Sequence, residues 1–192
     1  MKLIKNLAIF FFDILDSYHQ KKILGFIKNK YKNINFFIDI GSHKGKYFDL
    51  FNKNYKIKTA VLVEPQKKYF YYLKKKYKKL YSIKIYNTAI SNKNGNSYFY
   101  INHHDLTSSL NRINHNNLFL KIKSKLFGLD SKSMIKEKIK IKINTLNNLL
   151  RKFKVKKIDL VKIDTEGHEL EVLQGLKNTI KRVQVILIEF RS

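Results

Sequence analysis

The sequence has no cysteine, no tryptophan and a single proline, and its 14 acidic residues are outnumbered by 40 basic ones. The absence of cysteine excludes disulfides, thiolate metal ligands and cysteine nucleophiles, and it is compatible with a reducing compartment. We therefore expect a cytoplasmic protein whose chemistry depends on other side chains.

The shortage of acidic residues gives a formal net charge of +26 at pH 7. Such a charge is typical of proteins that bind nucleic acid or another polyanion. However, the basic residues are spread along the whole chain, and Lys, Asn, Ile, Tyr and Phe, whose codons are rich in A and T, are all frequent. We favour composition bias as the origin of the charge, which leaves nucleic acid as an open but less favoured partner.

A long hydrophobic run is also missing. The N-terminal run "LAIFFF" is far shorter than the ~20 residues needed to span a bilayer, and Asp13 and Asp16 interrupt the pattern of a signal peptide. Apolar residues recur there at helical spacing, which predicts an amphipathic helical segment over residues 1–30. We expect this segment to pack on the domain; its alternative role is a peripheral contact with a membrane surface.

Five apolar runs in the rest of the chain are candidates for strands covered on both faces. They are "NFFIDI" (35–40), "TAVLVE" (59–64), "IKIYNTAI" (83–90), "IDLVKID" (158–164) and "VQVILIEF" (183–190). Helical patterns over residues 44–54 and 65–80 separate the first three runs. This alternation predicts one α/β domain over residues 31–192, with a mostly parallel sheet and helices on both faces.

The middle of the chain interrupts this alternation. A turn at Asn94 and Gly95 precedes an alternating segment, which predicts either a hairpin or a strand added at a sheet edge. Periodicity then fades, and we expect a long loop or insertion over residues 102–138. Loops of this length in compact domains are usually functional or disordered.

Acidic residues close several of the predicted strands, at the edge where open α/β sheets bind ligands. These residues are Asp39, Glu64, Asp164 and Glu189. Glu64, at the end of the second strand, suits hydrogen bonds from the two hydroxyls of a ribose.

Two of the seven glycines, Gly41 and Gly45, follow the first strand and predict a sharp turn. The dinucleotide fingerprint is absent, because His43 and Lys46 stand where its second and third glycines belong, and the P-loop pattern is absent too. The remaining pattern D-x-G-x-x-x-G suits a nucleoside that carries an amino acid, whose ammonium can meet Asp39.

The blocks "IDIGSHKGKYFDLF", "VLVEPQKKYFYYL", "YNTAISNKNGN", "INTLNNLL" and "DLVKIDTEGHELEVLQGL" resemble the successive motifs of the FkbM-type S-adenosylmethionine-dependent methyltransferases. The resemblance implies a Rossmann-like methyltransferase fold and S-adenosylmethionine as cofactor. It also implies that Gly41, Ser42, His43 and Gly45 line the methionine and ribose part of this cofactor, that Glu64 binds ribose, and that Thr88 and Ala89 lie beside adenine. A fold of this type normally continues beyond "VILIEF" with a helix and an antiparallel strand pair, which we expect to be missing.

The block "KIDTEGHE" supplies the candidate catalytic residues Asp164, Glu166 and His168. A hydroxyl acceptor needs a base for its proton, and a histidine with an ordinary pKa of ~6.5 can serve. The alternative is that His168 is a solvated residue of the first helical turn and that the glutamates favour the helix N-terminus.

No metal site is expected. His103, His104, Asp105 and His115 are clustered in sequence, but neighbouring residues of a strand point to opposite faces. We instead expect this segment to cover the acceptor, with Thr107, Ser108 and Ser109 as contacts.

The sequence therefore predicts O-methylation of a hydroxyl on a sugar or another small molecule. Two alternatives remain open, an RNA methyltransferase and a non-catalytic binding protein that keeps the cofactor fold.

Overall fold

A computed structural model of the chain describes residues 18–102, 108–111, 135–153 and 155–189. The chain divides into two compact units, residues 1–33 with 114–134 and residues 34–113 with 135–192. In the first unit, residues 18–30 form a helix, and the Tyr31 amide donates to the Ile27 carbonyl at 2.8 Å. The first 17 residues of the amphipathic segment expected over residues 1–30 lie outside the described residues.

The second unit is built on a five-stranded parallel sheet with the strand order β3-β2-β1-β7-β8. Its strands are β1 (Phe36–Ile40), β2 (Thr59–Val63), β3 (Ile83–Tyr86), β7 (Ile158–Ile163) and β8 (Val183–Ile188). In β1 and β7 every residue is buried, as expected of strands that are covered on both faces. Within the described residues, β8 is an edge strand of this sheet.

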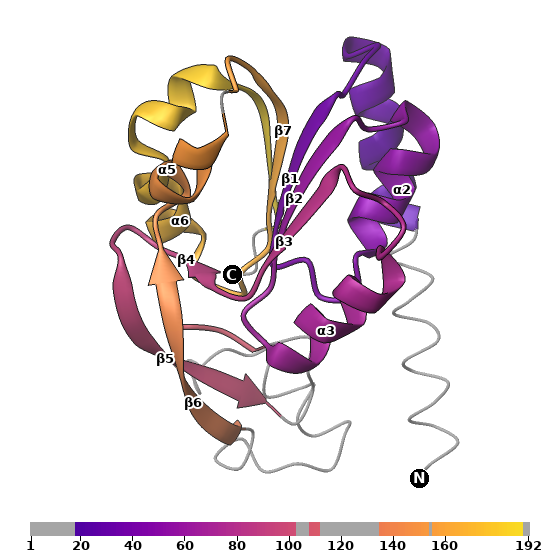
Figure 1. Cartoon of the computed structure of the whole chain (residues 1–192). Helices are drawn as coiled ribbons and strands as arrows, with labels where there is room; N and C mark the ends of the chain where they lie inside the picture. Colours follow the sequence, from indigo (N-terminus) through magenta and orange to yellow (C-terminus); the bar gives the residue numbers. More distant parts are fainter. Residues whose placement is uncertain (1–17, 103–107, 112–134, 154, 190–192) are drawn as a thin grey trace, which may run out of the picture. The chain divides into compact units, whose positions relative to one another are not determined.

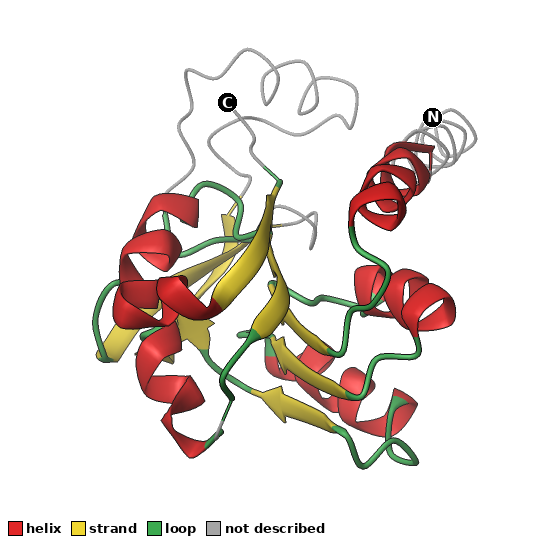
Figure 2. Cartoon of the chain, turned by 90° about the horizontal axis from the view of Figure 1, so that it is seen from above, coloured by secondary structure: helices red, strands yellow, loops and turns green. Residues whose placement is uncertain are grey.

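Helices cover both faces of the sheet, with α2 and α3 on one face and α5 and α6 on the other (Figure 1), and the view from above separates the same layers (Figure 2). The helices are α2 (Lys46–Tyr55), α3 (Lys67–Lys76), α5 (Leu146–Leu149) and α6 (Glu169–Leu176), and the 3₁₀ turns are η3 (Leu150–Lys152) and η4 (Lys177–Arg182). This Rossmann-like α/β arrangement is the fold class that the sequence predicted.

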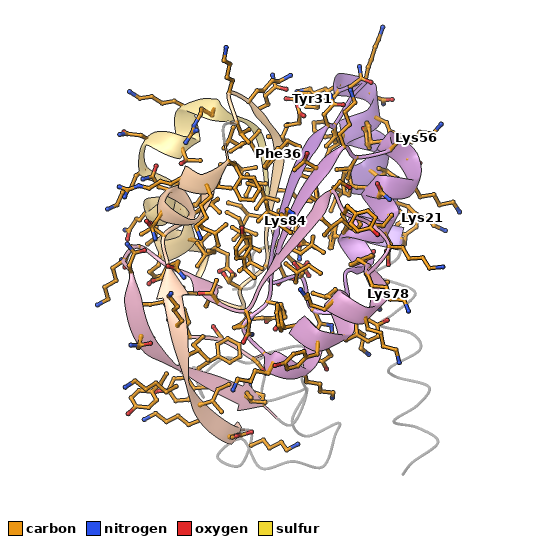
Figure 3. All side chains as sticks on the ribbon, viewed as in Figure 1. Lys21, Tyr31, Phe36, Lys56, Lys78 and Lys84 are labelled. Atoms are coloured by element: carbon orange, nitrogen blue, oxygen red, sulfur yellow. The ribbon has the colours of Figure 1, made fainter. Side chains whose placement is uncertain are left out.

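Side chains that alternate along the strands supply two apolar cores, which Figure 3 draws between the sheet and its helices. Phe36, Ile38 and Ile40 of β1 belong to the cluster on the α5 and α6 side. Phe37 points the other way and stacks on Phe51 of α2, with ring centroids 5.6 Å apart. Asp39 follows Phe37 at the same alternation, so its carboxylate lies on the α2 side.

A second, three-stranded sheet has the order β4-β6-β5. Its strands are β4 (Ala89–Ile90), β5 (Gly95–Asn102) and β6 (Ile135–Asn144). β6 runs parallel to β4 and antiparallel to β5. Since β6 lies between β4 and β5, the hairpin alternative for the turn at Asn94 and Gly95 is wrong, and β5 is the edge addition.

Two sequence boundaries also differ from the structure. The predicted strand 83–90 is divided at Asn87 and Thr88, and its two parts enter different sheets as β3 and β4. The loop expected over residues 102–138 is interrupted by β6, which begins at Ile135. The alternation of Ile and Lys in "IKEKIKIKIN" indicates this strand, but the polar residues before it obscured where it begins.

Candidate functional site

Parallel strands bring the predicted acidic residues to one edge of the sheet. Asp39 pairs with Leu62 of β2 and with Lys162 of β7, so Gly41, Glu64 and Asp164 follow the ends of three neighbouring strands. Backbone hydrogen bonds extend the ladder past the strand ends, with the Asp164 amide donating to the Ile40 carbonyl at 3.0 Å. The residues that follow these three strands therefore lie together at the carboxyl edge of the sheet.

The loop after β1 is held tightly against β2. The Gly41 and Ser42 amides both donate to the Val63 carbonyl, at 3.0 and 3.1 Å. The Ser42 hydroxyl donates to the Asp39 carbonyl at 2.7 Å and accepts from the Val63 amide at 3.1 Å. The φ angles of Gly41, His43 and Gly45 are 80°, 45° and 73°, so three residues of this loop have left-handed backbone conformations.

The structure explains why residue 41 is a glycine. A Cβ at this position would collide with the backbone carbonyl oxygen of Asp164. The glycine therefore allows the loop after β1 to approach the turn after β7, in addition to its positive φ. At Gly45 a Cβ would meet the Tyr77 hydroxyl and would lie 3.1 Å from Leu73 Cδ2.

Glu64 is buried and accepts one backbone hydrogen bond on each carboxylate oxygen. The His43 amide donates to Oε2 at 2.9 Å, and the Gln66 amide donates to Oε1 at 2.8 Å. Burial raises the pKa of Glu64 to about 7, although the two backbone donors oppose this shift. Because a carboxylate has about four lone-pair positions, roughly two acceptor positions remain for hydroxyl donors.

A buried charge cluster that the sequence analysis missed lies beside this loop. Lys162, 3% exposed, donates to Asp164 Oδ2 at 2.9 Å, and its Nζ lies 3.7 Å from Asp39 Oδ1. The same ammonium lies 4.6 Å from the centroid of the Tyr47 ring. A lysine inside the mostly apolar strand "IDLVKI" was the available signal, because a buried ammonium requires partners.

The two aspartates of the cluster, Asp39 and Asp164, have carboxylate oxygens that can accept further hydrogen bonds. Three of their oxygens have no hydrogen-bond partner among the described residues: both carboxylate oxygens of Asp39 and Oδ1 of Asp164. Burial raises the pKa of Asp39 to about 6, although Lys162 partly offsets the shift. Burial alone would lower the pKa of Lys162, but Asp164 and Asp39 outweigh it and the pKa is raised.

The turn between β7 and α6 is closed by Glu169. Its Oε1 accepts from the Thr165 amide, the Thr165 hydroxyl and the Gly167 amide, each at 3.0 Å. Gly167 and Glu166 within this turn have φ angles of 97° and 56°. A positive φ at a half-buried glutamate is uncommon, and such conformations cluster at functional sites.

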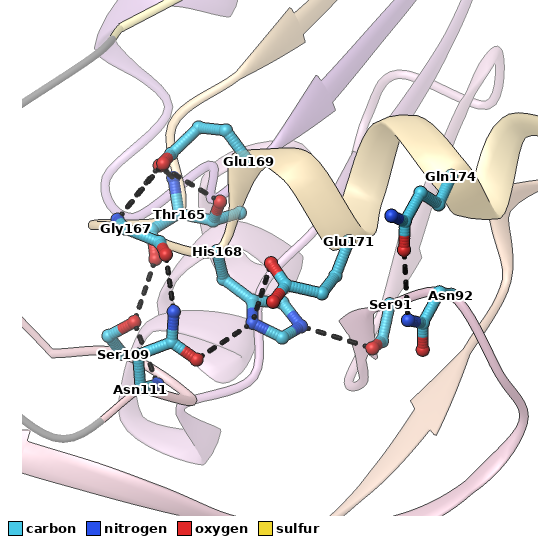
Figure 4. Close-up of polar contacts among 10 residues, drawn as sticks. All are labelled: Ser91, Asn92, Ser109, Asn111, Thr165, Gly167, His168, Glu169, Glu171 and Gln174. Carbon is cyan, nitrogen blue, oxygen red and sulfur yellow. Dashed lines mark hydrogen bonds and ion pairs between the residues drawn. The ribbon is translucent and has the colours of Figure 1, made fainter.

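His168 is held on both ring nitrogens (Figure 4). Its Nε2 lies 3.0 Å from Ser91 Oγ, and its Nδ1 lies 3.0 Å from Asn111 Oδ1 and 3.4 Å from Glu171 Oε2. Burial lowers the pKa of His168, although Glu171 and Glu169 oppose the shift. His168 therefore joins α6 to the segments after β4 and β5; sequence reasoning identified neither Ser91 nor Asn111.

Thr88 and Ala89, the residues expected beside adenine, are buried, Thr88 just before β4 and Ala89 as its first residue. The Thr88 hydroxyl donates to the Lys142 carbonyl at 2.8 Å and accepts from Asn144 Nδ2 at 2.9 Å. The neighbouring Asn87 donates through Nδ2 to the Glu64 carbonyl at 3.0 Å. This segment therefore adjoins the strand end that carries Glu64.

Two serines of the expected acceptor-covering segment also have defined places. Ser108 Oγ accepts from the Asn102 amide at 3.1 Å, and Ser109 Oγ donates to the Thr165 carbonyl at 3.0 Å. Asn111 Nδ2 donates to the Gly167 carbonyl. Thr107 and the sequence cluster His103, His104, Asp105 and His115 lie outside the described residues. Across the described ranges, no three His, Cys, Asp or Glu side chains gather as a metal site would require.

Comparison with known proteins relates this chain to a protein family and, over a short stretch, to a curated relative. Residues 39–192 match the family described as "Methyltransferase FkbM domain". A 52-residue stretch is 38% identical to hexuronic acid methyltransferase AglP of Haloferax volcanii, and it covers 27% of this chain and 22% of that protein.

The matched length decides what these comparisons establish. The AglP stretch is about a fifth of that protein, whereas the family match includes most of this chain and every strand of the five-stranded sheet except the first residues of β1. In the part of the chain that the structure describes, no helix has the length and apolar character of a membrane span. On the extent of the family match, the chain belongs to the FkbM methyltransferase family.

Proposed function

We propose that this protein transfers a methyl group from S-adenosylmethionine to a hydroxyl oxygen of a sugar, and that a hexuronic acid is the preferred acceptor class. Methyl transfer is supported by the family, and the acidic sugar by the name of the relative in Haloferax volcanii. When bound, S-adenosylmethionine supplies an electrophilic methyl group on a sulfonium centre.

The observation that carries the proposal is the pair of buried carboxylates at the ends of β1 and β2. Asp39 has two oxygens without hydrogen-bond partners among the described residues, which fits an ammonium donor such as that of a methionine moiety. Glu64 keeps acceptor capacity after it binds the His43 and Gln66 amides, which fits two ribose hydroxyls.

The remaining residues of the proposed cofactor site surround these two carboxylates. Gly41, Ser42, His43 and Gly45 form the loop between them, and we assign this loop to the methionine and ribose part of the cofactor. We assign Thr88 and Ala89 to the adenine. Support for the adenine site comes from Asn87, which ties the start of this segment to the Glu64 carbonyl.

For the acceptor, we propose that Asp164 orients the reacting hydroxyl and receives its proton. Oδ2 of Asp164 is held by Lys162, whereas Oδ1 has no hydrogen-bond partner among the described residues. Glu166, in the adjoining strained turn, is assigned to acceptor binding. His168 is assigned a positioning role, because both of its ring nitrogens already contact protein groups.

The cofactor assignment is tested by calorimetric titration with S-adenosylmethionine and S-adenosylhomocysteine. The wild-type protein should bind both, and Glu64→Ala should weaken binding by at least about tenfold, because two hydrogen bonds to a charged group are lost. Glu137→Ala, which removes an exposed carboxylate from β6, should bind like the wild type. A folded wild-type protein that binds neither ligand would disprove the cofactor assignment.

The acceptor assignment is tested by incubating the protein with S-adenosylmethionine and glucuronic acid glycosides, with mass spectrometry of the products. Asp164→Asn should reduce kcat by about 100-fold, the usual contribution of a general base, while it leaves S-adenosylhomocysteine affinity within about threefold. Methylation of glycosides without a carboxylate, and not of glucuronides, would refute the hexuronic acid part of the proposal.

A further inference from the structure

One face of the β5 and β6 pair carries a regular row of cations. The strand register places Lys138 opposite Tyr100, Lys140 opposite Tyr98 and Lys142 opposite Asn96, and residues directly opposite each other share a face. All three lysines are exposed. Since alternate residues of a strand are about 7 Å apart, the three lysines form a row along β6. We call these three lysines, together with Asn96, Tyr98 and Tyr100, the lysine face.

The lysine face contains no carboxylate on either strand. Glu137, the acidic residue of β6, is opposite Ile101 and therefore belongs to the other face of the pair. Apart from Glu137 near its end, the other face carries mainly apolar side chains, and Phe99 and Ile143 are only 4% and 3% exposed. The alternation of Ile and Lys in β6 therefore produces one packed face and one face of uniform positive charge.

The two tyrosines position Lys138, the first lysine of the row. Lys138 Nζ lies 3.9 Å from the centroid of the Tyr98 ring and 6.0 Å from that of Tyr100. Such a contact orients the ammonium over the rings. Tyr98 is 52% exposed, so its ring edge and hydroxyl remain accessible to a ligand.

The lysine face is also linked to the proposed acceptor site within the same compact unit. Tyr100 and Ser109 exchange backbone hydrogen bonds of 2.8 and 3.1 Å, and the Ser109 hydroxyl donates to the Thr165 carbonyl at 3.0 Å. Thr165 directly follows Asp164. In the part of the chain that the structure describes, the segment at Ser109 therefore connects the strand that carries Tyr98 and Tyr100 to the turn after β7.

We propose that the lysine face binds an extended saccharide chain that carries carboxylates, and so holds an acidic polymeric acceptor beside the methyl-transfer site. That the bound saccharide is the methyl acceptor rests on the proposed function, whereas its binding to the lysine face does not. Lys138, Lys140 and Lys142 pair with successive carboxylates, and the tyrosine hydroxyls hydrogen-bond to the sugar hydroxyls.

The contact between Lys138 and Tyr98 favours a saccharide over single-stranded nucleic acid. Proteins that bind single strands without sequence preference use open aromatic faces on which bases stack. Here an ammonium group lies over the face of Tyr98, so that ring presents a cation where a base would stack. An acidic saccharide fits this arrangement, because its carboxylate can contact Lys138 and its hydroxyls can contact the edge of the Tyr98 ring.

The test is a binding titration without turnover, with hexagalacturonate as the probe and uncharged maltohexaose as its neutral counterpart. The wild-type protein should bind hexagalacturonate and not maltohexaose. A triple variant, Lys138→Gln, Lys140→Gln and Lys142→Gln, should lose about tenfold or more in affinity, because three exposed ion pairs are removed. Tyr98→Ser should weaken binding by about threefold, since it frees Lys138 from its position.

A charge-matched control separates the lysine face from the general charge of the protein. The triple variant Lys74→Gln, Lys75→Gln and Lys78→Gln removes the same number of exposed charges from α3 and the residues after it, and it should change affinity by less than about twofold. Equal losses in the two triple variants, or no binding of hexagalacturonate by the wild type, would overturn the proposal. So would tighter binding of a single-stranded RNA that depends on the same three lysines.

Failure of the proposed function would give a different result. S-adenosylhomocysteine titration of both triple variants checks that the carboxyl-edge site is intact. Binding of hexagalacturonate that depends on the lysine face, combined with no methylated product, would support the binding site and reject the acceptor role. Methylated glucuronides combined with no effect of the three lysines would support the activity and reject this site.

Discussion

At the residue scale, the ribose contact proposed for Glu64 predicts that cofactor binding depends on pH. Its pKa is raised to about 7 by burial, so the ligand-free protein holds it partly protonated near neutrality. A ribose whose hydroxyls donate to the carboxylate favours the ionised form, which lowers the pKa in the complex. Binding of S-adenosylmethionine should therefore release a proton from Glu64.

We expect the affinity for S-adenosylmethionine to rise about tenfold between about pH 6 and about pH 8, because the ionised fraction of a group with a pKa near 7 increases by that factor. Calorimetry in buffers of different ionisation enthalpy measures the affinity and the released proton. Asp39, with a pKa of about 6, adds a second increase at the lower end of this range. Glu64→Gln should remove most of the pH dependence, and a wild-type affinity that stays constant would contradict the assignment.

The buried Lys162 is a second determinant at this scale. Lys162→Met leaves Asp39 and Asp164 close together without the cation that neutralises them. We expect the variant to lose about 3 kcal/mol of unfolding free energy at neutral pH, as when one partner of a buried pair is removed. The loss should shrink as the pH falls, because protonation of Asp39 removes the unpaired charge. Urea unfolding measures both effects.

The matched substitution for Lys162→Met is Lys84→Met, at an exposed position of β3. It should change the unfolding free energy by less than about 0.5 kcal/mol. If the two variants were equally stable, the cluster around Lys162 would have no structural role.

The sequence predicted the residues that follow strand ends better than those that pair across the fold. Gly41, Glu64 and Asp164 were identifiable because parallel strands end at the same edge. The close approach of the Asp164 carbonyl, which excludes a side chain at Gly41, was not identifiable, because Asp164 is far away in the sequence. The contacts of His168 with Ser91 and Asn111 depend equally on tertiary packing.

At the element scale, the two helical glycines have opposite surroundings. A Cβ at Gly25, in the helix over residues 18–30, meets no atom of the described residues within 4 Å. A Cβ at Gly175 in α6 would collide with the Ser91 backbone carbonyl, at the place where His168 and Ser91 also meet. Gly175 therefore sets how closely α6 approaches the segment after β4.

We expect Gly25→Ala to stabilise its helix by about 0.5 to 1 kcal/mol, since alanine restricts the unfolded chain and favours helix. Gly175→Ala should instead destabilise the protein by about 2 kcal/mol, as overpacking does. Thermal unfolding followed by circular dichroism measures both changes. A stabilising Gly175→Ala would show that α6 can move away from Ser91 without cost.

Elements were predictable where periodicity was strong, and uncertain where a strand belonged to a different sheet. The runs that became β1, β2 and β7 were located within a residue or two. The division of residues 83–90 was not visible, because Ile83 to Ile90 remain largely apolar across the break at Asn87 and Thr88. The pairing of β5 with β6 could not be predicted either, since the local sequence pattern does not show which distant strands pair.

At the scale of the whole molecule, the net charge of +26 opposes the folded state through self-repulsion. The repulsion acts between exposed lysines and is screened over about 10 Å at 0.1 M salt. The cluster at Lys162 is screened less, because Lys162 and Asp39 are buried. Salt should therefore stabilise this protein mainly through its surface.

We expect the Tm to rise by about 3 to 6 °C when sodium chloride increases from about 0.02 M to about 0.3 M, which corresponds to 1 to 2 kcal/mol in a chain of this size. Scanning calorimetry at several salt concentrations measures the slope. The α3 variant Lys74→Gln, Lys75→Gln and Lys78→Gln and the lysine-face variant should both reduce the slope, because each lowers the net charge by three. A slope unchanged in both variants would mean that chloride acts by binding at another site. In that case the surface charge would be balanced locally, as between Lys76 and Asp49, and would not act through long-range repulsion.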